Sequence, residues 1–228
     1  MAGSAARAGA PTTLAVSELS AGERAAVYRW LAGLFAREQT VESLRHYRSA
    51  EGRALLGALG EIAPLAPAAE SVARSTTDIP EADLPGRALD LAGDFARLFL
   101  GVGGRRTVPP YQSFYSSPEG RVMQAPAAAM QGALRQRNRR LAEAFPEPPD
   151  HLAVQLSMLA ELVETAPAAE QAAFLDTRLL GWIGEFAARC AAADRTGFYA
   201  VAARALADFA VADRAALAAD FPARVACG

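Results

Sequence analysis

Apolar residues recur every three to four positions along most of the chain, which is the spacing of helices with one buried face. The first such segment, 20–38, begins with Ser20 and Glu23, a capping-box pair. Similar stripes in 87–101 and 152–166 predict two further core-facing helices. The stripe residues of the three segments are Val27, Trp30, Leu31, Leu34 and Phe35; Leu91, Phe95, Leu98 and Phe99; and Leu152, Leu156, Leu159 and Val163.

The remaining pattern predicts an all-α protein. Further helices are expected at about 40–49, 51–60, 66–76, 127–145, 168–193, 195–209 and 211–220. Val, Ile and Thr are sparse and do not alternate with polar residues, which disfavours strands. We therefore expect a single globular, bundle-like domain of about nine to eleven helices over residues 18–222, after a disordered tail at 1–17. The proline-rich breaks at 78–86, 101–119 and 145–149 are predicted to be interhelical loops, with a hinge at 101–119 as an alternative.

Composition narrows the class of protein. The chain is 52% hydrophobic, so it can bury a large core, and its net charge of −2 disfavours a nucleic-acid-binding protein. No signal peptide and no apolar run of about 18 residues is evident, so a cytoplasmic protein without integral membrane association is expected. Two cysteines without a CxxC partner fit a reducing compartment; Cys190 is predicted to be buried and Cys227 exposed.

Motifs for catalysis are missing. "GVGGRR" at 101–106 lacks the GK[ST] ending of a phosphate-binding loop, and neither HExxH nor GxSxG occurs. His46 and His151 are the only histidines, too few for an ordinary catalytic zinc site. The chain is therefore predicted not to be an enzyme, although a Ser113–His151 pair stays open as a hydrolase alternative. The arginines at 135, 137, 139 and 140 are expected to form a solvated face.

Two stretches stand out from the helical background. "VPPYQSFYSSPEG" (108–120) places three rings on a stiff loop, where they either form a binding surface or pack on the core. "EPPDHLAVQL" (147–156) begins a helix, and Asp150 there complements the positive end of the helix dipole. Capping does not account for His151, which shares a helix face with Gln155 and Met158.

In combination these stretches resemble the TorD/DmsD/NarJ family, cytoplasmic chaperones dedicated to molybdenum oxidoreductases. The residues that carry the resemblance are "DFARLFLG", "PPYQSFYSSPEGRVM" and "EPPDHLAVQLSML", and the likeness extends over about residues 20–210. It implies a TorD-like, all-helical chaperone. Such a protein binds the twin-arginine signal peptide of the apo catalytic subunit of a molybdopterin oxidoreductase. It thereby delays export until the cofactor has been inserted.

The resemblance also implies a set of peptide-binding residues. The family positions correspond to Pro110, Tyr111, Ser113, Tyr115, Asp150 and His151, and we add Phe114 and Gln155 as neighbours of these side chains. The family often has Glu at positions 112 and 155, so Gln112 and Gln155 are expected to remove charge that could meet the arginines. The client enzyme is not named by the sequence.

The physical hypothesis is a trough for the signal peptide. Tyr111, Phe114 and Tyr115 would pack its apolar segment, as in helix-in-groove recognition. Asp150, with Glu119 and Glu147 as acidic neighbours, would meet the arginines. His151 would titrate near neutral pH and make binding pH-sensitive.

Three alternatives remain at this stage. No cofactor is expected, but in the first alternative "GVGGRR" and the arginine cluster weakly contact a guanine nucleotide or a molybdopterin dinucleotide. Ser113 and His151 could support hydrolysis, or the protein could be a plain helical scaffold. The loop at 101–119 leaves both a monomer and a domain-swapped dimer open.

Overall fold

Helix α1 (Ala21–Ala36) begins where the capping pair predicts, because the Ser20 side chain accepts a hydrogen bond from the Glu23 backbone N–H. The computed structural model describes residues 13–141 and 145–219. The other helices are α2 (Val41–His46), α3 (Ala50–Gly60), α4 (Ala66–Ser75), α5 (Leu84–Phe99), α6 (Gln112–Ser116), α7 (Ala125–Gln136), α8 (Leu152–Thr165), α9 (Ala168–Phe174), α10 (Ile183–Ala193) and α11 (Phe198–Ala219). Three 3-10 turns and one π-helix, η4 (Leu175–Leu179), complete the set. Within the described ranges there is no strand, so the all-α prediction is confirmed.

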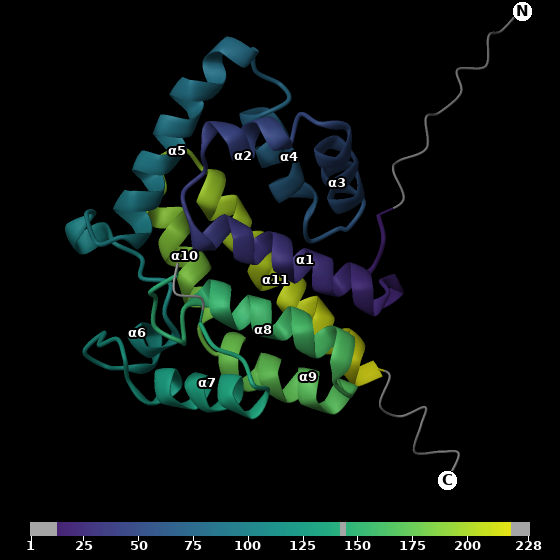
Figure 1. The fold of residues 1–228 in the computed structure, drawn as a ribbon, viewed down its shortest axis with the longest axis vertical. Helices are drawn as coiled ribbons and strands as arrows, with labels where there is room; N and C mark the ends of the chain where they lie inside the picture. The colour runs from purple at the N-terminus through teal and green to yellow at the C-terminus, as the bar shows by residue number, and fades with distance from the viewer. Residues whose placement is uncertain (1–12, 142–144, 220–228) are drawn as a thin grey trace, which may run out of the picture.

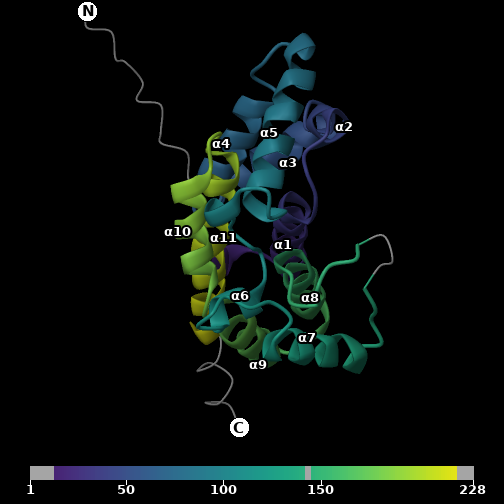
Figure 2. The same cartoon turned by 90° about the vertical axis from the view of Figure 1, so that its left-hand side faces the viewer.

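The core lies where α1, α8 and α11 cross the middle of the molecule (Figure 1). Helices α2–α5 lie to one side of this layer, and α6, α7 and α9 lie to the other, as Figures 1 and 2 show. Rings from four helices meet in the core through edge-on and stacked contacts. They are Phe35 of α1, Phe95 and Phe99 of α5, Phe186 of α10 and Tyr199 of α11. The packing of these rings joins helices from the first half of the chain to helices from the second half.

A buried ionic network also joins distant parts of the sequence. Asp213 of α11 is fully buried and accepts hydrogen bonds from Arg24 and from the hydroxyl of Tyr28, both on α1. Arg24 additionally donates to the Gln171 side chain of α9, at 2.9 Å. Burial and the Asp213 carboxylate raise the pKa of Tyr28, so its phenol stays protonated.

Several predicted helix boundaries were wrong. The helices predicted at 195–209 and 211–220 are instead parts of one helix, α11 (Phe198–Ala219), which contains no glycine or proline. The helix predicted at 127–145 ends at Gln136, and Asn138 has a left-handed φ of 55°, a conformation typical of helix ends. The segment 168–193 is divided by the π-helix and a turn at 180–182. The predicted loop 101–119 contains the short helix α6.

The ends of the chain are described in part. Leu14 donates its backbone N–H to the Glu61 carbonyl at 2.6 Å, and Val16 is buried, so ordered structure begins before residue 18. Residues 1–12 of the predicted tail, residues 220–222 of the predicted domain and Cys227 lie outside the described residues. Cys190 is a buried free thiol, as predicted. No helix in the described ranges is long and apolar enough to cross a membrane.

Candidate functional site

Two distant segments form a short antiparallel pair at the candidate site. The Gln112 N–H donates to the Asp150 carbonyl at 3.2 Å, and the Leu152 N–H donates to the Pro110 carbonyl at 2.8 Å. Tyr111 and His151 are therefore directly opposite each other. This pairing brings the start of α6 to the start of α8, so the two stretches singled out in the sequence do lie together.

Asp150 holds the loop instead of lining an exposed trough. Its side chain is fully buried, and Oδ2 accepts hydrogen bonds from the backbone N–H (2.7 Å) and the hydroxyl (2.5 Å) of Ser113. The Ser113 hydroxyl in turn accepts from the Gln124 N–H at 3.1 Å. The hypothesis that Asp150 itself meets the peptide's arginines is not supported by this geometry. Its carboxylate positions the residues at 113 and 124.

His151 is the N-cap of α8, which corrects the sequence-based view that capping does not account for it. Its Nδ1 accepts a hydrogen bond from the Ala153 N–H at 3.0 Å, and this requires a neutral ring with its proton on Nε2. The ring lies between Tyr111 and Phe145, with centroid distances of 5.3 and 5.1 Å. Burial lowers the pKa of His151 to about 4. The predicted titration near neutral pH is therefore wrong.

Tyr111 and Glu147 are the partly exposed groups of this site. The Tyr111 hydroxyl donates a hydrogen bond to Oε2 of Glu147 at 2.7 Å. Burial, followed by the hydrogen bond to Glu147, raises the pKa of Tyr111, so the phenol remains a donor at neutral pH. Glu147 is thus a carboxylate with access to solvent beside an aromatic ring. Glu119, the other acidic residue expected near Asp150, is exposed in the turn after α6 and lies 3.6 Å from Arg121.

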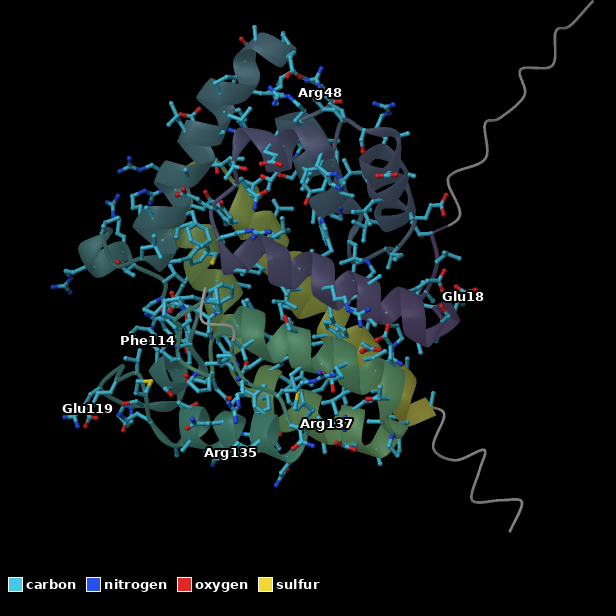
Figure 3. The ribbon with its side chains drawn as sticks, viewed as in Figure 1. Glu18, Arg48, Phe114, Glu119, Arg135 and Arg137 are labelled. Carbon is cyan, nitrogen blue, oxygen red and sulfur yellow. The ribbon has the colours of Figure 1, made fainter. Side chains whose placement is uncertain are left out.

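Phe114 and Tyr115 do not extend the Tyr111 surface, because their ring contacts are with each other and with residues near α10. Tyr115 stacks on Trp182 with a centroid distance of 5.1 Å, and burial raises its pKa. The Arg189 guanidinium lies 5.3 Å from the centroid of Phe114 and 5.6 Å from that of Tyr115. Figure 3 labels Phe114 at the left of the molecule. The predicted surface of three rings is therefore divided, and Phe114 and Tyr115 anchor the loop.

Gln112 and Gln155 face inward. Both are buried, and Nε2 of Gln155 donates to Oε1 of Gln112 at 2.8 Å. Nε2 of Gln112 then donates to the Thr177 carbonyl in the π-helix at 2.9 Å. The expectation that these residues alter charge facing a peptide was wrong, because they join α6, α8 and the π-helix internally. π-Helical turns often occur beside functional sites.

An apolar groove that the sequence analysis did not identify lies next to His151. Its volume is about 350 Å3, and its walls come from α1, α7, α8 and the segment before Glu147. The lining residues are Ala36, Leu134, Arg139, Arg140, Leu141, Phe145, Ala153, Val154, Ser157, Met158 and Glu161. The one sequence signal for it was Met158, which shares a helix face with His151. Phe145 lines the groove and contacts His151, whose other face contacts Tyr111, so the His151 ring lies between the groove residue Phe145 and Tyr111.

The geometry disfavours hydrolysis by Ser113 and His151 and leaves fewer unpaired groups in the arginine cluster. The Ser113 hydroxyl is fully buried and donates to Asp150, while Nδ1 of His151 caps α8, so the proposed Ser113–His151 pair is not formed. In the arginine cluster, Arg137 pairs with Glu170 and Arg139 pairs with Glu161.

Comparisons with known proteins find one matching family model and several relatives that cover most of the chain. The family model described as nitrate reductase delta subunit matches residues 63–188, a range that contains both site segments. A chaperone protein TorD from Vibrio atlanticus is 32% identical over 207 residues, covering 86% of this chain and 95% of the relative. Another from a Psychrobacter species is 36% identical over 178 residues, covering 73% and 78% of the two chains. The chain belongs to the TorD/NarJ family. A third relative in this family, the TorD of Vibrio parahaemolyticus, is 32% identical over 206 residues, 86% of this chain and 94% of its own.

Proposed function

We propose that the protein is a chaperone that binds the twin-arginine signal peptide of a molybdopterin oxidoreductase subunit. Relatives that cover most of the chain are named chaperones. The observation that carries the proposal is that the Tyr111–Glu147 pair is linked to an apolar groove through the His151 ring, which contacts both Tyr111 and the groove residue Phe145. A twin-arginine signal has the matching chemistry, a basic pair followed by an apolar segment.

The basic end of the peptide would bind at Glu147. This carboxylate has solvent access, and among the described residues only its Oε2 accepts a hydrogen bond, so it can receive a guanidinium through charge-assisted hydrogen bonds. The Tyr111 ring beside it offers a face for the second guanidinium. Arginine suits such a site better than lysine because its planar fork makes two parallel hydrogen bonds.

The apolar segment of the peptide would lie in the groove. Leu141, Phe145 and Met158 line it, and an amphipathic helix can bury its apolar face against such side chains. The thioether of Met158 adapts to different apolar sequences, which suits a site that receives a signal peptide of variable composition. Asp150 and His151 act indirectly in this scheme, as the groups that hold residues 111–113 and the start of α8.

A calorimetric titration with a synthetic twin-arginine signal peptide tests the peptide site. We expect Glu147→Gln to weaken binding by about tenfold, the cost of one charged hydrogen bond. Glu164→Gln is the matched control, since Glu164 is an exposed carboxylate paired with Arg29. A peptide with Lys-Lys in place of Arg-Arg should bind the unaltered protein more weakly. Equal affinities for Glu147→Gln and Glu164→Gln would contradict the assignment of Glu147.

Asp150→Asn separates a positioning role from direct contact. The amide oxygen of Asn can still accept both hydrogen bonds from Ser113, so loop position and peptide affinity should be nearly unchanged. A loss as large as that of Glu147→Gln would instead mean that the Asp150 charge meets the peptide.

The proposed biological role is to keep the apo catalytic subunit on the cytoplasmic side until its cofactor has been inserted. Export of a reporter that carries the signal peptide measures this role. Co-expression of the chaperone should slow export, and the Glu147→Gln variant should slow it less. Export at the same rate with and without the chaperone would argue against the role.

A further inference from the structure

Exposed apolar side chains gather on two turns. Among the described residues, six large hydrophobic side chains are exposed, and four of them lie in residues 100–106 and 119–123. These four are Leu100 (55% exposed), Val102 (72%), Val122 (42%) and Met123 (62%). Both turns project from the same side of the molecule, on the left in Figure 1 and toward the viewer in Figure 2. We call residues 100–106 and 119–123 the exposed edge.

Arginines flank these apolar tips. Arg105 and Arg106 follow Val102 and are exposed, and neither has an ion-pair partner among the described residues. Arg121 precedes Val122 and makes only a long contact of 3.6 Å with Glu119, the one acidic residue of the edge. The exposed edge therefore has a net positive charge in a protein whose total charge is −2.

Contacts with the rest of the fold hold both turns in positions that expose their tips. Gly103 packs so closely on the Arg97 carbonyl that a Cβ there would lie 2.2 Å from its oxygen. The Val108 N–H donates to the Leu98 carbonyl at 2.6 Å and closes the first turn. In the second turn, Met123 has a left-handed φ of 59°, and the next residue, Gln124, donates its N–H to Ser113. A left-handed φ is unfavourable for methionine, so contacts of the turn with its surroundings hold Met123 in this conformation.

We propose that the exposed edge binds the surface of an anionic lipid bilayer. Apolar side chains that enter the interfacial region, with arginines beside them at the level of the headgroups, are the pattern of peripheral membrane binding. A protein partner fits less well, because protein interfaces need a continuous complementary patch of about 800 Å2 on each side. Separate tips on two turns suit a fluid surface that adapts around them. The charge of the edge selects acidic lipids.

Vesicle co-sedimentation tests the proposal on the full chain without any signal peptide. We expect the protein to sediment with vesicles of equal parts phosphatidylglycerol and phosphatidylcholine, and not with phosphatidylcholine alone. Binding should fall as salt increases, because the arginine contribution is screened. The double variant Arg105→Gln/Arg106→Gln should bind about 20-fold more weakly, and Val102→Ser/Met123→Ser about tenfold more weakly.

Matched controls make the outcome decisive. Arg74→Gln/Arg204→Gln removes two exposed arginines of α4 and α11, and Val211→Ser removes an exposed apolar side chain of α11. Both controls should bind vesicles like the unaltered protein. Because all of these positions are exposed, the thermal melts of the variants should coincide with that of the unaltered protein.

Absence of sedimentation with acidic vesicles would overturn the proposal, as would equal losses in test and control variants. Binding to polyglutamate but not to vesicles would assign the edge to a protein partner and overturn it too. Signal-peptide affinity should not change in the edge variants, so this result is independent of the peptide site.

Discussion

At the scale of single residues, His151 and Asp150 act through burial. His151 caps α8 with a neutral ring, and Asp150 accepts two hydrogen bonds from Ser113 in the interior. Both residues therefore stabilise the backbone that forms the site. Substituting them should change the free energy of unfolding in the absence of any ligand.

The pH dependence of unfolding tests the state of His151. Its folded-state pKa of about 4 lies below the usual 6.5, so the unfolded chain binds the extra proton first as pH falls. The contribution is fully present above pH 6.5 and is lost progressively between pH 6.5 and 4. Between pH 7 and pH 5, the free energy of unfolding of the unaltered protein should fall by about 2 kcal/mol more than that of His151→Asn, which keeps an N-cap acceptor. Urea unfolding at the two pH values measures this difference. Parallel losses in the two proteins would mean that His151 is not protected from protonation.

Asp150→Leu should destabilise the protein, in contrast to Asp150→Asn. Leucine leaves the Ser113 N–H and hydroxyl without their buried acceptor, at a cost of roughly 2–4 kcal/mol in the free energy of unfolding. Asp150→Asn should change it by less than about 1 kcal/mol, because one amide oxygen can accept both bonds. Denaturant unfolding of the two variants measures the difference. Equal stabilities would show that the bonds to Ser113 contribute little.

At the scale of elements, the site depends on how α6 and its following turn are held. Gln112 connects α6 to α8 and to the π-helix, while Phe114 packs against Gly120 at the next turn. A short helix of five residues has little stability of its own, so these tertiary contacts determine its position.

Gly120→Ala should disturb this turn. Gly120 has a φ of 64°, and a Cβ there would lie 2.9 Å from Cε2 of Phe114. We expect a loss of about 1–2 kcal/mol in the free energy of unfolding. Gly132→Ala is the control, because Gly132 lies within α7 with open space at its Cβ position, and it should gain up to about 1 kcal/mol. A neutral Gly120→Ala would show that the turn adapts freely.

At the scale of the whole molecule, Asp213 joins the first helix to the last described one. Asp213→Ala would leave the Arg24 guanidinium and the Tyr28 hydroxyl without their acceptor in a buried position. We expect a loss of about 3–5 kcal/mol in the free energy of unfolding. Asp208→Ala, at an exposed pair with Arg204 on the same helix, should change it by less than about 0.5 kcal/mol. Similar effects of the two substitutions would mean that the buried network is not a main support of the fold.

The amino-acid sequence by itself determined the all-helical class, the stripe that α1 buries and the closeness of residues 108–120 to 147–156. Helical spacing and capping are local properties, and the resemblance to a family supplied the pairing of the two stretches. Only the tertiary structure decided that Asp150, Ser113 and Gln155 are buried, that Glu147 has access to solvent and that an apolar groove lies beside His151. Burial depends on neighbours from α1, α6, α7 and α8 that are distant in sequence, and the spacing of residues along one helix contains no information about what covers it.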